Sequence, residues 1–262
     1  MTDKHEMDIR TAIFLAAVCE QTYNLFRNDG LFLVPRSYRL IGTFNAASSY
    51  SINQERFGFV IESDQAVILA FRGTSTPTDW VTDMIAQQVL FKPVKRGCKT
   101  HRGFSEVYMS ARDQIFHLLD QTSKDKPLFI TGHSLGGALA AHAALDIAIN
   151  RKPKNLITYT FGAPRAGDPE FARSYNDAVP LTFRIQNEFD IVPHLPPLVY
   201  TLPKSKKTYY YMHVKEGVMR KFHNGSISGN HVIGSYFANL AKDAPEFAAM
   251  FCDGQPGMCP LP

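Results

Sequence analysis

The chain has 262 residues, of which 45% are hydrophobic and 20% are charged. This composition is typical of a folded protein with a substantial core, and it excludes a disordered or fibrous chain. The 28 Lys and Arg exceed the 24 Asp and Glu by four, a balance that by itself indicates neither a nucleic acid nor an anionic membrane as partner. Apolar runs stay well below the roughly 18 residues of a membrane-spanning helix.

The first predicted element is an amphipathic helix near the N-terminus. Apolar residues recur at helical spacing between Ile9 and Tyr23. A secretory signal would need a cationic start and a small-residue cleavage site, and neither is clear here. The chain as given therefore shows no export signal, and whether one precedes it is open at this point.

Strands and helices then alternate. Strands are predicted at residues 57–61, 66–71, 127–131, 155–161 and 181–186. Helices are predicted from about residue 104, at 134–150 and at 168–176. Strands separated by helices of this length indicate βαβ units and a mostly parallel sheet. No repeat or linker divides the sequence, so we expect a single domain over residues 1–262 with an irregular tail from Asp253.

The four cysteines show no spacing typical of a zinc site. Cys19 lies in an apolar stretch, which favours a buried and unreactive thiol. Cys252 and Cys259 enclose a short loop and can form a disulfide if the protein is secreted. Metal and cofactor sites are not expected, because the motifs for metal, nucleotide or dinucleotide binding are missing.

A candidate nucleophile stands between a predicted strand and a predicted helix. Residues 132–136 read G-H-S-L-G, which fits the G-x-S-x-G pattern in the strand–turn–helix context that supports it. Glycines two residues on either side let a strained turn pack closely, and the helix N-terminus favours negative charge developing at Ser134. The alternative is that Ser134 only caps the helix.

Four blocks of sequence resemble the class 3 (fungal-type) lipases. Residues 132–138 are similar to the nucleophile turn of that family, 71–74 to the end of its oxyanion strand, 161–168 to the segment after its next strand, and 187–197 to the stretch with its catalytic aspartate. The resemblance implies an α/β-hydrolase fold, with a mostly parallel central sheet flanked by helices and a short helical lid. It also implies hydrolysis of carboxylic esters and an extracellular location.

A serine nucleophile needs a histidine base, and the histidine needs a carboxylate that orients it. In this fold the chain order is Ser, then acid, then His. Asp190 follows a predicted strand and resembles the family's aspartate, so we predict that it is the orienting acid. Asp168 and Asp177 are weaker candidates, since Asp168 precedes Pro169 and reads as a helix cap.

The histidine is less clear from the sequence, because four histidines follow Asp190. His194 is too near in sequence, and His213 resembles a strand histidine of the family. His231 is similar to the family's catalytic histidine ahead of a Tyr-Phe pair, so we predict that it is the base. His223 is the remaining alternative.

Two further features follow from the resemblance. The tetrahedral intermediate needs hydrogen-bond donors, and we expect them at the backbone N–H of Leu135 and at the N–H and hydroxyl of Thr74. The segment after Thr74 corresponds to the family's lid, and its apolar residues share one helical face. These predicted lid residues are Trp80, Val81, Met84 and Ile85. A short core-packed helix is the alternative for this segment.

The sequence therefore predicts a serine hydrolase that acts on acylglycerols, a triacylglycerol lipase, through an acyl-Ser134 intermediate. The expected partners are an ester substrate and a lipid–water interface, without nucleic acid; the oligomeric state is open. The alternatives are a carboxylesterase similar to feruloyl esterases, which uses the same residues on soluble esters, and a non-catalytic lipid-binding module.

Overall fold

The protein is built around a seven-stranded sheet, and the computed structural model describes residues 6–47, 54–74, 86–95, 97–202 and 205–261. The strand order in the sheet is β1-β2-β3-β6-β7-β8-β11. These strands are β1 (Arg39–Ala47), β2 (Gln54–Glu62), β3 (Val67–Phe71), β6 (Leu128–His133), β7 (Leu156–Phe161), β8 (Leu181–Asn187) and β11 (Gly217–Arg220). The pairs from β3 to β11 are parallel, whereas β1, β2 and β3 are antiparallel. The predicted, mostly parallel sheet is confirmed.

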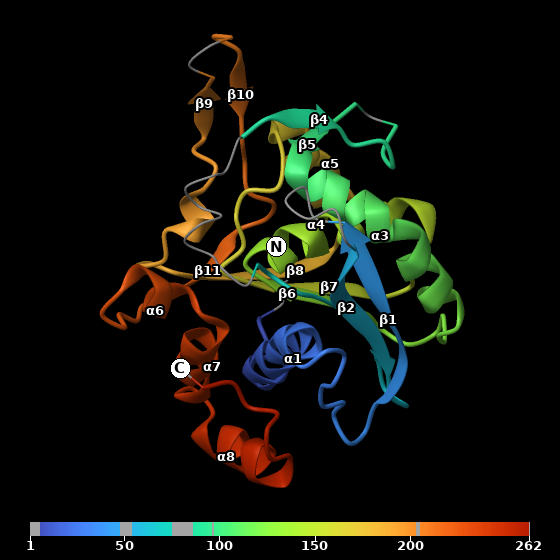
Figure 1. Cartoon of the computed structure of the whole chain (residues 1–262), viewed down its shortest axis with the longest axis vertical. Helices are drawn as coiled ribbons and strands as arrows, with labels where there is room; N and C mark the ends of the chain where they lie inside the picture. Colours follow the sequence, from blue (N-terminus) through green and yellow to red (C-terminus); the bar gives the residue numbers. More distant parts are fainter. Residues whose placement is uncertain (1–5, 48–53, 75–85, 96, 203–204, 262) are drawn as a thin grey trace.

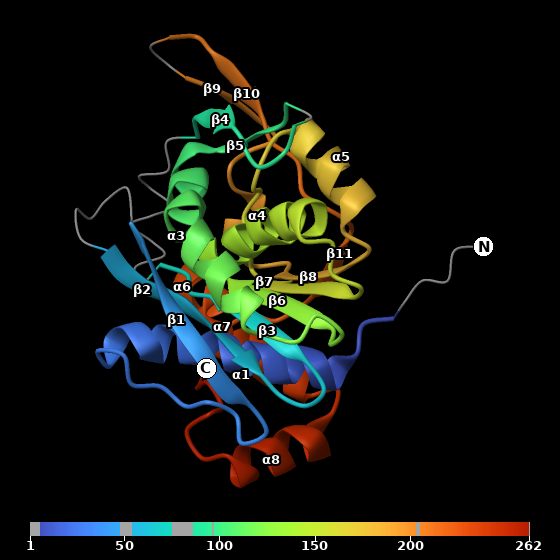
Figure 2. The same cartoon turned by 90° about the vertical axis from the view of Figure 1, so that its right-hand side faces the viewer.

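Helices cover both faces of this sheet (Figure 1). One face carries α3 (Arg102–Asp120), α4 (Leu135–Asn150) and α5 (Pro169–Ala178), and the other carries α1 (Ile9–Arg27), α7 (Ile233–Ala241) and α8 (Pro245–Gly254). Figure 2 shows the same three layers from the side. The predicted α1, α3, α4 and α5 are confirmed, while the sequence analysis missed β1, β11 and both C-terminal helices.

Short elements connect these layers around the carboxyl ends of the parallel strands. They comprise the antiparallel pairs β4 (Gln88–Leu90) with β5 (Lys99–His101) and β9 (Val199–Thr201) with β10 (Thr208–Tyr210), the 3₁₀ helix η1 (Val192–His194) and the helix α6 (Ile227–His231). Their strands have three residues each, which is too short for an alternating pattern to stand out in the sequence.

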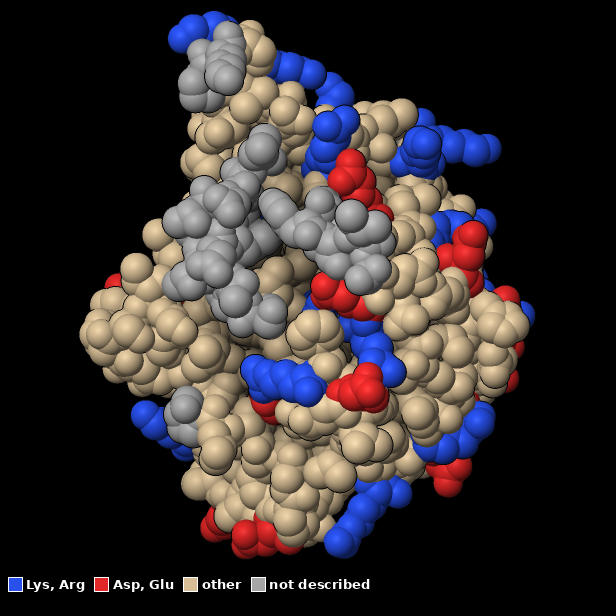
Figure 3. All heavy atoms as spheres, in the orientation of Figure 1, with Lys and Arg blue, Asp and Glu red and all other residues tan. Residues whose placement is uncertain are grey.

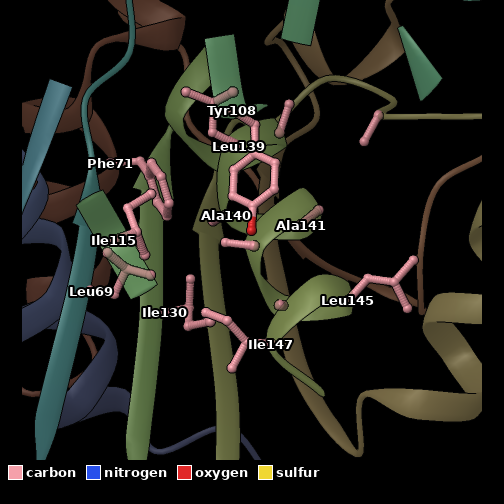
Figure 4. Close-up of a cluster of buried hydrophobic side chains, with 14 of the residues drawn as sticks. Leu69, Phe71, Tyr108, Ile115, Ile130, Leu139, Ala140, Ala141, Leu145 and Ile147 are labelled. Carbon is pink, nitrogen blue, oxygen red and sulfur yellow. The ribbon is translucent and has the colours of Figure 1, made fainter. Parts of the chain in front are cut away.

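The larger part of the core lies between α3, α4 and the sheet. Figure 4 shows Leu69 and Ile130 of the sheet facing Ile115 of α3 and Leu139 of α4. Every residue of α4 from Leu135 to Ile147 is buried. Its many alanines allow such close packing, because they lose no rotamer freedom and leave room for neighbouring side chains.

Two cysteine predictions have clear outcomes. Cys19 is fully buried, so the prediction of a buried thiol is confirmed, and burial raises the pKa of this thiol to about 12, which disfavours the reactive thiolate. Cys252 and Cys259 form a disulfide that joins α8 to the tail after it. In the described part of the chain, no helix combines the length and the apolar character that crossing a membrane requires.

A buried carboxylate joins α3 to α4. Asp146 is fully buried and accepts hydrogen bonds from the Tyr108 hydroxyl at 2.7 Å and from Arg112 Nε and Nη2 at 2.6 and 3.0 Å. Asn150 Nδ2 donates a further bond of 2.7 Å. A charge in the interior is tolerated only when it is paired and hydrogen-bonded. The three bonds from Tyr108 and Arg112 therefore fix the relation of α3 to α4, while the Asn150 bond lies within α4.

We predict that Asp146→Ala lowers the free energy of unfolding by about 3 kcal/mol, because it leaves a guanidinium and a tyrosine hydroxyl without their acceptor. Asp120→Ala is the matched control, since Asp120 is exposed and pairs with Arg151 at 2.8 Å on the surface. The Asp120→Ala variant should lose less than about 1 kcal/mol of its free energy of unfolding. Urea denaturation measures both values, and equal losses would show that the buried carboxylate has no special role.

Candidate active site

Ser134 occupies the turn between β6 and α4. Its backbone has φ 58° and ψ −129°, a conformation that L-residues rarely adopt. A Cβ added to Gly132 would lie 2.2 Å from the Gly136 carbonyl oxygen, and one added to Gly136 would lie 2.3 Å from that of Phe71. Only glycine fits at these two positions. The Ser134 side chain makes no capping hydrogen bond to α4, so the alternative of a simple helix cap is wrong.

The structure brings Ser134 together with two of the predicted residues. His231 Nε2 lies 2.8 Å from Ser134 Oγ, and His231 Nδ1 lies 2.7 Å from Asp190 Oδ2. All three residues are buried. Along the chain, His231 is 41 residues from Asp190 and 97 residues from Ser134. Ser134 follows the end of β6, Asp190 lies in the loop after β8, and His231 ends α6.

The hydrogen bonds decide where the protons are. An ionised Asp190 only accepts, so Nδ1 of His231 carries the proton that it donates to the carboxylate. Nε2 of the neutral ring then holds a free lone pair and accepts the Ser134 hydroxyl hydrogen. This tautomer is the one in which a histidine can remove a proton from serine.

Asp190 is held by two more donors. The Tyr236 hydroxyl donates to Oδ2 at 2.7 Å, and the backbone N–H of Val192 donates to Oδ1 at 2.9 Å. Burial, followed by the nearby Asp190 charge, raises the pKa of Tyr236 far above its ordinary value, so its hydroxyl stays protonated and keeps donating. Gly162, at φ 56°, lies against this group, where a Cβ would come within 2.9 Å of Asp190 Oδ2.

Asparagine side chains hold the segment that carries His231. Asn187 at the end of β8 donates from Nδ2 to the Asn230 carbonyl at 3.1 Å and accepts the Phe222 N–H at 3.1 Å. Asn230 in turn accepts the Asn224 N–H at 2.7 Å. These bonds satisfy buried polar groups and set the position of α6 next to the sheet.

The other histidines after Asp190 lie elsewhere. His223 is exposed and accepts the N–H of Gly225, and His194 lies in η1. His213 donates from Nε2 to the Pro193 carbonyl at 2.6 Å, so its hydrogen bond is satisfied. The prediction that it belongs to a strand is wrong, because β10 ends at Tyr210 and the chain turns toward β11.

Comparison with known proteins shows the family to which the chain belongs. The family model described as lipase (class 3) matches residues 68–200. The chain belongs to the class 3 lipase family. A lipase of Rhizomucor miehei is 35% identical over 156 residues, which are 57% of this chain and 42% of that protein. This class 3 lipase chain thus spans about two fifths of the length of the curated relatives it matches.

Solved structures show the fold of this class 3 lipase chain. The triacylglyceride lipase of Rhizomucor miehei superposes with a TM-score of 0.66 and 27% identity, covering 80% of this chain and 79% of that one. A second structure, described as a triacylglycerol lipase whose catalytic centre is a serine protease triad, has a TM-score of 0.64 and 26% identity over 79% and 84%. The α/β-hydrolase fold predicted from the sequence is confirmed.

The two predicted oxyanion donors come from two segments near Ser134: Leu135 follows it directly, and Thr74 follows Gly73, where an added Cβ would lie 3.1 Å from Ser134 Cβ. Leu135 is the first residue of α4, where backbone N–H groups have no acceptor within the helix. Thr74 follows the end of β3, the strand that pairs with β6. Its hydroxyl is buried and has no hydrogen-bond partner among the described residues. Both positions therefore have donors available for a ligand.

The predicted lid residues Trp80, Val81, Met84 and Ile85 lie outside the described residues, so the lid stays a prediction. Among the residues that the structure does describe, no group of three His, Cys, Asp or Glu side chains is arranged to hold a metal ion.

A second hydrogen-bonded chain, which the sequence analysis missed, supports His231 from behind. His133 Nε2 donates to the His231 carbonyl at 2.6 Å, so its Nδ1 is unprotonated and accepts the Tyr23 hydroxyl at 2.7 Å. The rings of His133 and His231 lie 4.7 Å apart. Burial, and then the neighbouring His231, lowers the pKa of His133 well below its ordinary value, which keeps the ring neutral.

Tyr23 belongs to α1, which precedes the segment that the family model matches. The N-terminal helix thus reaches the nucleophile turn with one hydroxyl. No sequence motif indicates this contact, since 110 residues separate its partners. The pairing depends on α1 packing under β6 in the folded protein.

We predict that Tyr23→Phe slows the reaction of Ser134 with a fluorophosphonate several-fold, because His133 loses the donor that fixes its tautomer. The buried acceptor left without a partner should also lower the free energy of unfolding by about 1–3 kcal/mol. Tyr175→Phe is the matched control: Tyr175 is fully buried and its hydroxyl contacts Thr182 at 2.9 Å, away from Ser134. The Tyr175→Phe variant should lower the free energy of unfolding without changing the labelling rate of Ser134. Equal labelling rates in both variants would contradict a role for Tyr23 at the site.

Proposed function

We propose that this chain is a serine hydrolase that cleaves carboxylic ester bonds of acylglycerols, with triacylglycerol as a substrate. The observation that carries the proposal is the buried, hydrogen-bonded line from Ser134 through His231 to Asp190. Each member has the proton arrangement that nucleophilic catalysis by serine requires.

In the proposed acylation, Ser134 Oγ attacks the ester carbonyl carbon while His231 Nε2 takes the hydroxyl proton. The imidazolium keeps its Nδ1–H bond to Asp190, whose negative charge stabilises it. The carbonyl oxygen becomes an oxyanion, which accepts hydrogen bonds from Leu135 and Thr74. The C–O bond to the leaving alcohol then breaks, and His231 gives its proton to that oxygen.

Deacylation repeats the same steps with water. His231 Nε2 takes a proton from a water molecule as the water oxygen attacks the acyl carbon of acyl-Ser134. The second tetrahedral intermediate collapses, the fatty acid leaves, and the proton returns from His231 to Ser134 Oγ. One ester and one water thus yield one alcohol and one acid, and the enzyme is restored.

The surface next to the site supports a lipid substrate rather than a small soluble ester. Phe189 and Ile191, on either side of the buried Asp190, are 42% and 41% exposed. Exposed apolar residues at the edge of a reactive centre are suited to contact with acyl chains or a lipid–water interface. The similarity to lipases, described above, points to the same class of substrate.

We predict that Ser134→Ala lowers kcat on emulsified trioctanoylglycerol by a factor on the order of 10⁴ to 10⁶, since it removes the nucleophile. His231→Ala should match it, because loss of either residue disables the same unit. His223→Ala is the control and should keep most of the activity. Fatty-acid release in a pH-stat measures all three.

Three outcomes would change the proposal. A folded Ser134→Ala variant that retains more than a few per cent of activity would exclude Ser134 as nucleophile. If the unaltered protein hydrolyses soluble p-nitrophenyl butyrate but not the emulsion, it is an esterase. If a fluorophosphonate leaves Ser134 unlabelled and neither ester is cleaved, the non-catalytic lipid-binding alternative holds.

A separate prediction concerns the buried hydroxyl of Thr74. Thr74→Val keeps the shape and the backbone N–H and removes only the hydroxyl, so kcat should fall roughly 10²-fold with little change in KM, as expected for a bond formed in the transition state. Thr74→Ser, which keeps the hydroxyl, should restore much of the rate. An unchanged kcat in the valine variant would exclude the hydroxyl from the oxyanion site.

A further inference from the structure

Two stretches of the sequence carry all of the excess positive charge. Residues 86–105 and 191–215 contain nine Lys and Arg and no Asp or Glu. The whole chain has 28 Lys and Arg and 24 Asp and Glu, so the remainder has 19 basic and 24 acidic residues. The mild net charge of the chain therefore conceals two strongly basic segments in an otherwise acidic protein.

The fold places these two segments side by side. The first forms the β4–β5 hairpin and the second forms the β9–β10 hairpin, and both project from the same end of the molecule (Figures 1 and 2). Gln88 Nε2 donates to the Tyr210 carbonyl at 2.6 Å across the two hairpins. Gly167 forms backbone bridges with Thr100 on one side and Met212 on the other. Figure 3 shows Lys and Arg gathered over this end.

A groove of about 340 Å³ lies between the hairpins. Lys99 and Lys207 line it from opposite sides, together with Leu90 and Tyr210. The acidic residue in the lining is Asp168, whose carboxylate accepts the Phe171 N–H at 2.8 Å and so caps α5. The helix N-terminus offsets part of its charge, which leaves the lysines dominant.

Apolar side chains stand on the same hairpins. Leu90, Leu198, Val199 and Tyr210 are each more than half exposed. Apolar side chains of this size standing together on one surface indicate an interaction site. Their combination with lysines, rather than with acidic residues, is typical of proteins that bind a negatively charged lipid surface.

The same surface lies next to the reactive centre. A Cβ added to Gly162 would lie 2.9 Å from Asp190 Oδ2 and 3.1 Å from His231 Cε1, and Gly167, five residues later, bridges both hairpins. Five extended residues span at most about 17 Å. A lipid surface that met the hairpins would thus also lie near Ser134.

We propose that the β4–β5 and β9–β10 hairpins dock the protein onto anionic phospholipid, with lysines pairing with headgroup phosphates and apolar side chains entering the bilayer surface. The inference rests on the proposed function in that a lipase must meet its substrate at a lipid surface. A nucleic acid would pair with the same lysines, but exposed aliphatic residues such as Leu90 and Val199 favour lipid.

The test is cosedimentation with vesicles of phosphatidylglycerol and phosphatidylcholine, with all proteins carrying Ser134→Ala so that the lipid stays intact. Each lysine near an anionic surface contributes on the order of 1 kcal/mol, so the triple variant Lys99→Gln, Lys206→Gln, Lys207→Gln should bind about 100-fold more weakly at low salt. Binding by the parent should also weaken steeply as salt is raised, as expected from charge screening.

The matched control removes three lysines from the opposite end of the sheet. Lys124, Lys152 and Lys154 line a groove at the amino ends of β3 and β6. Their replacement by Gln changes the net charge equally and should alter vesicle binding by less than about threefold. Circular dichroism melting curves establish that both triple variants are folded.

Three results would overturn the inference: equal loss in both triple variants, unchanged binding in the hairpin variant, or equal binding of the parent to pure phosphatidylcholine. Tighter binding to a DNA duplex than to the anionic vesicles would assign the surface to nucleic acid instead. The unaltered protein is assayed separately on emulsified trioctanoylglycerol and on p-nitrophenyl butyrate. Failure to cleave either ester would reject the proposed hydrolase while leaving the lipid-binding result intact.

Discussion

The site depends on one buried negative charge. The Asp190 carboxylate has no contact with solvent and is compensated by three donors, from His231, Tyr236 and the backbone of Val192. Leaving such a charge unpaired in a protein interior costs several kcal/mol, so each donor must be in place when the chain is folded. The loop after β8, the helix α6 and the helix α7 are therefore positioned by the same carboxylate, and His231 obtains its orientation from it.

The second constraint is the strained turn at Ser134. A residue held at φ 58° costs roughly 1–3 kcal/mol, and such a conformation persists only where its surroundings impose it. Here the surroundings are the parallel pairing of β6 with β3 and β7 on one side and the fully buried helix α4 on the other. The alanine-rich core thus has a consequence for chemistry, because it holds the serine hydroxyl away from the helix and toward His231.

The structure also shows how elements outside the matched family segment contribute to the site. The helix α1 supplies the Tyr23 hydroxyl that fixes the His133 ring, and the His133 ring in turn holds the backbone carbonyl of His231. The C-terminal helices supply Tyr236 and close the other side of the sheet. Residues that never touch a substrate therefore set the geometry of those proposed to do so.

The local features of this protein could be predicted from its sequence. Periodic apolar residues identified the main helices and the central strands, and the glycines around Ser134 identified the strained turn, because these depend on neighbours a few residues away. The position of Asp190 also followed from a local block of sequence. The folded structure places His231, and not His223, beside Ser134, joins Tyr23 to His133, and brings two basic hairpins side by side. These contacts join residues far apart in the chain; Ser134 and His231, for example, are 97 residues apart. Such contacts form only when the sheet and its helices have packed.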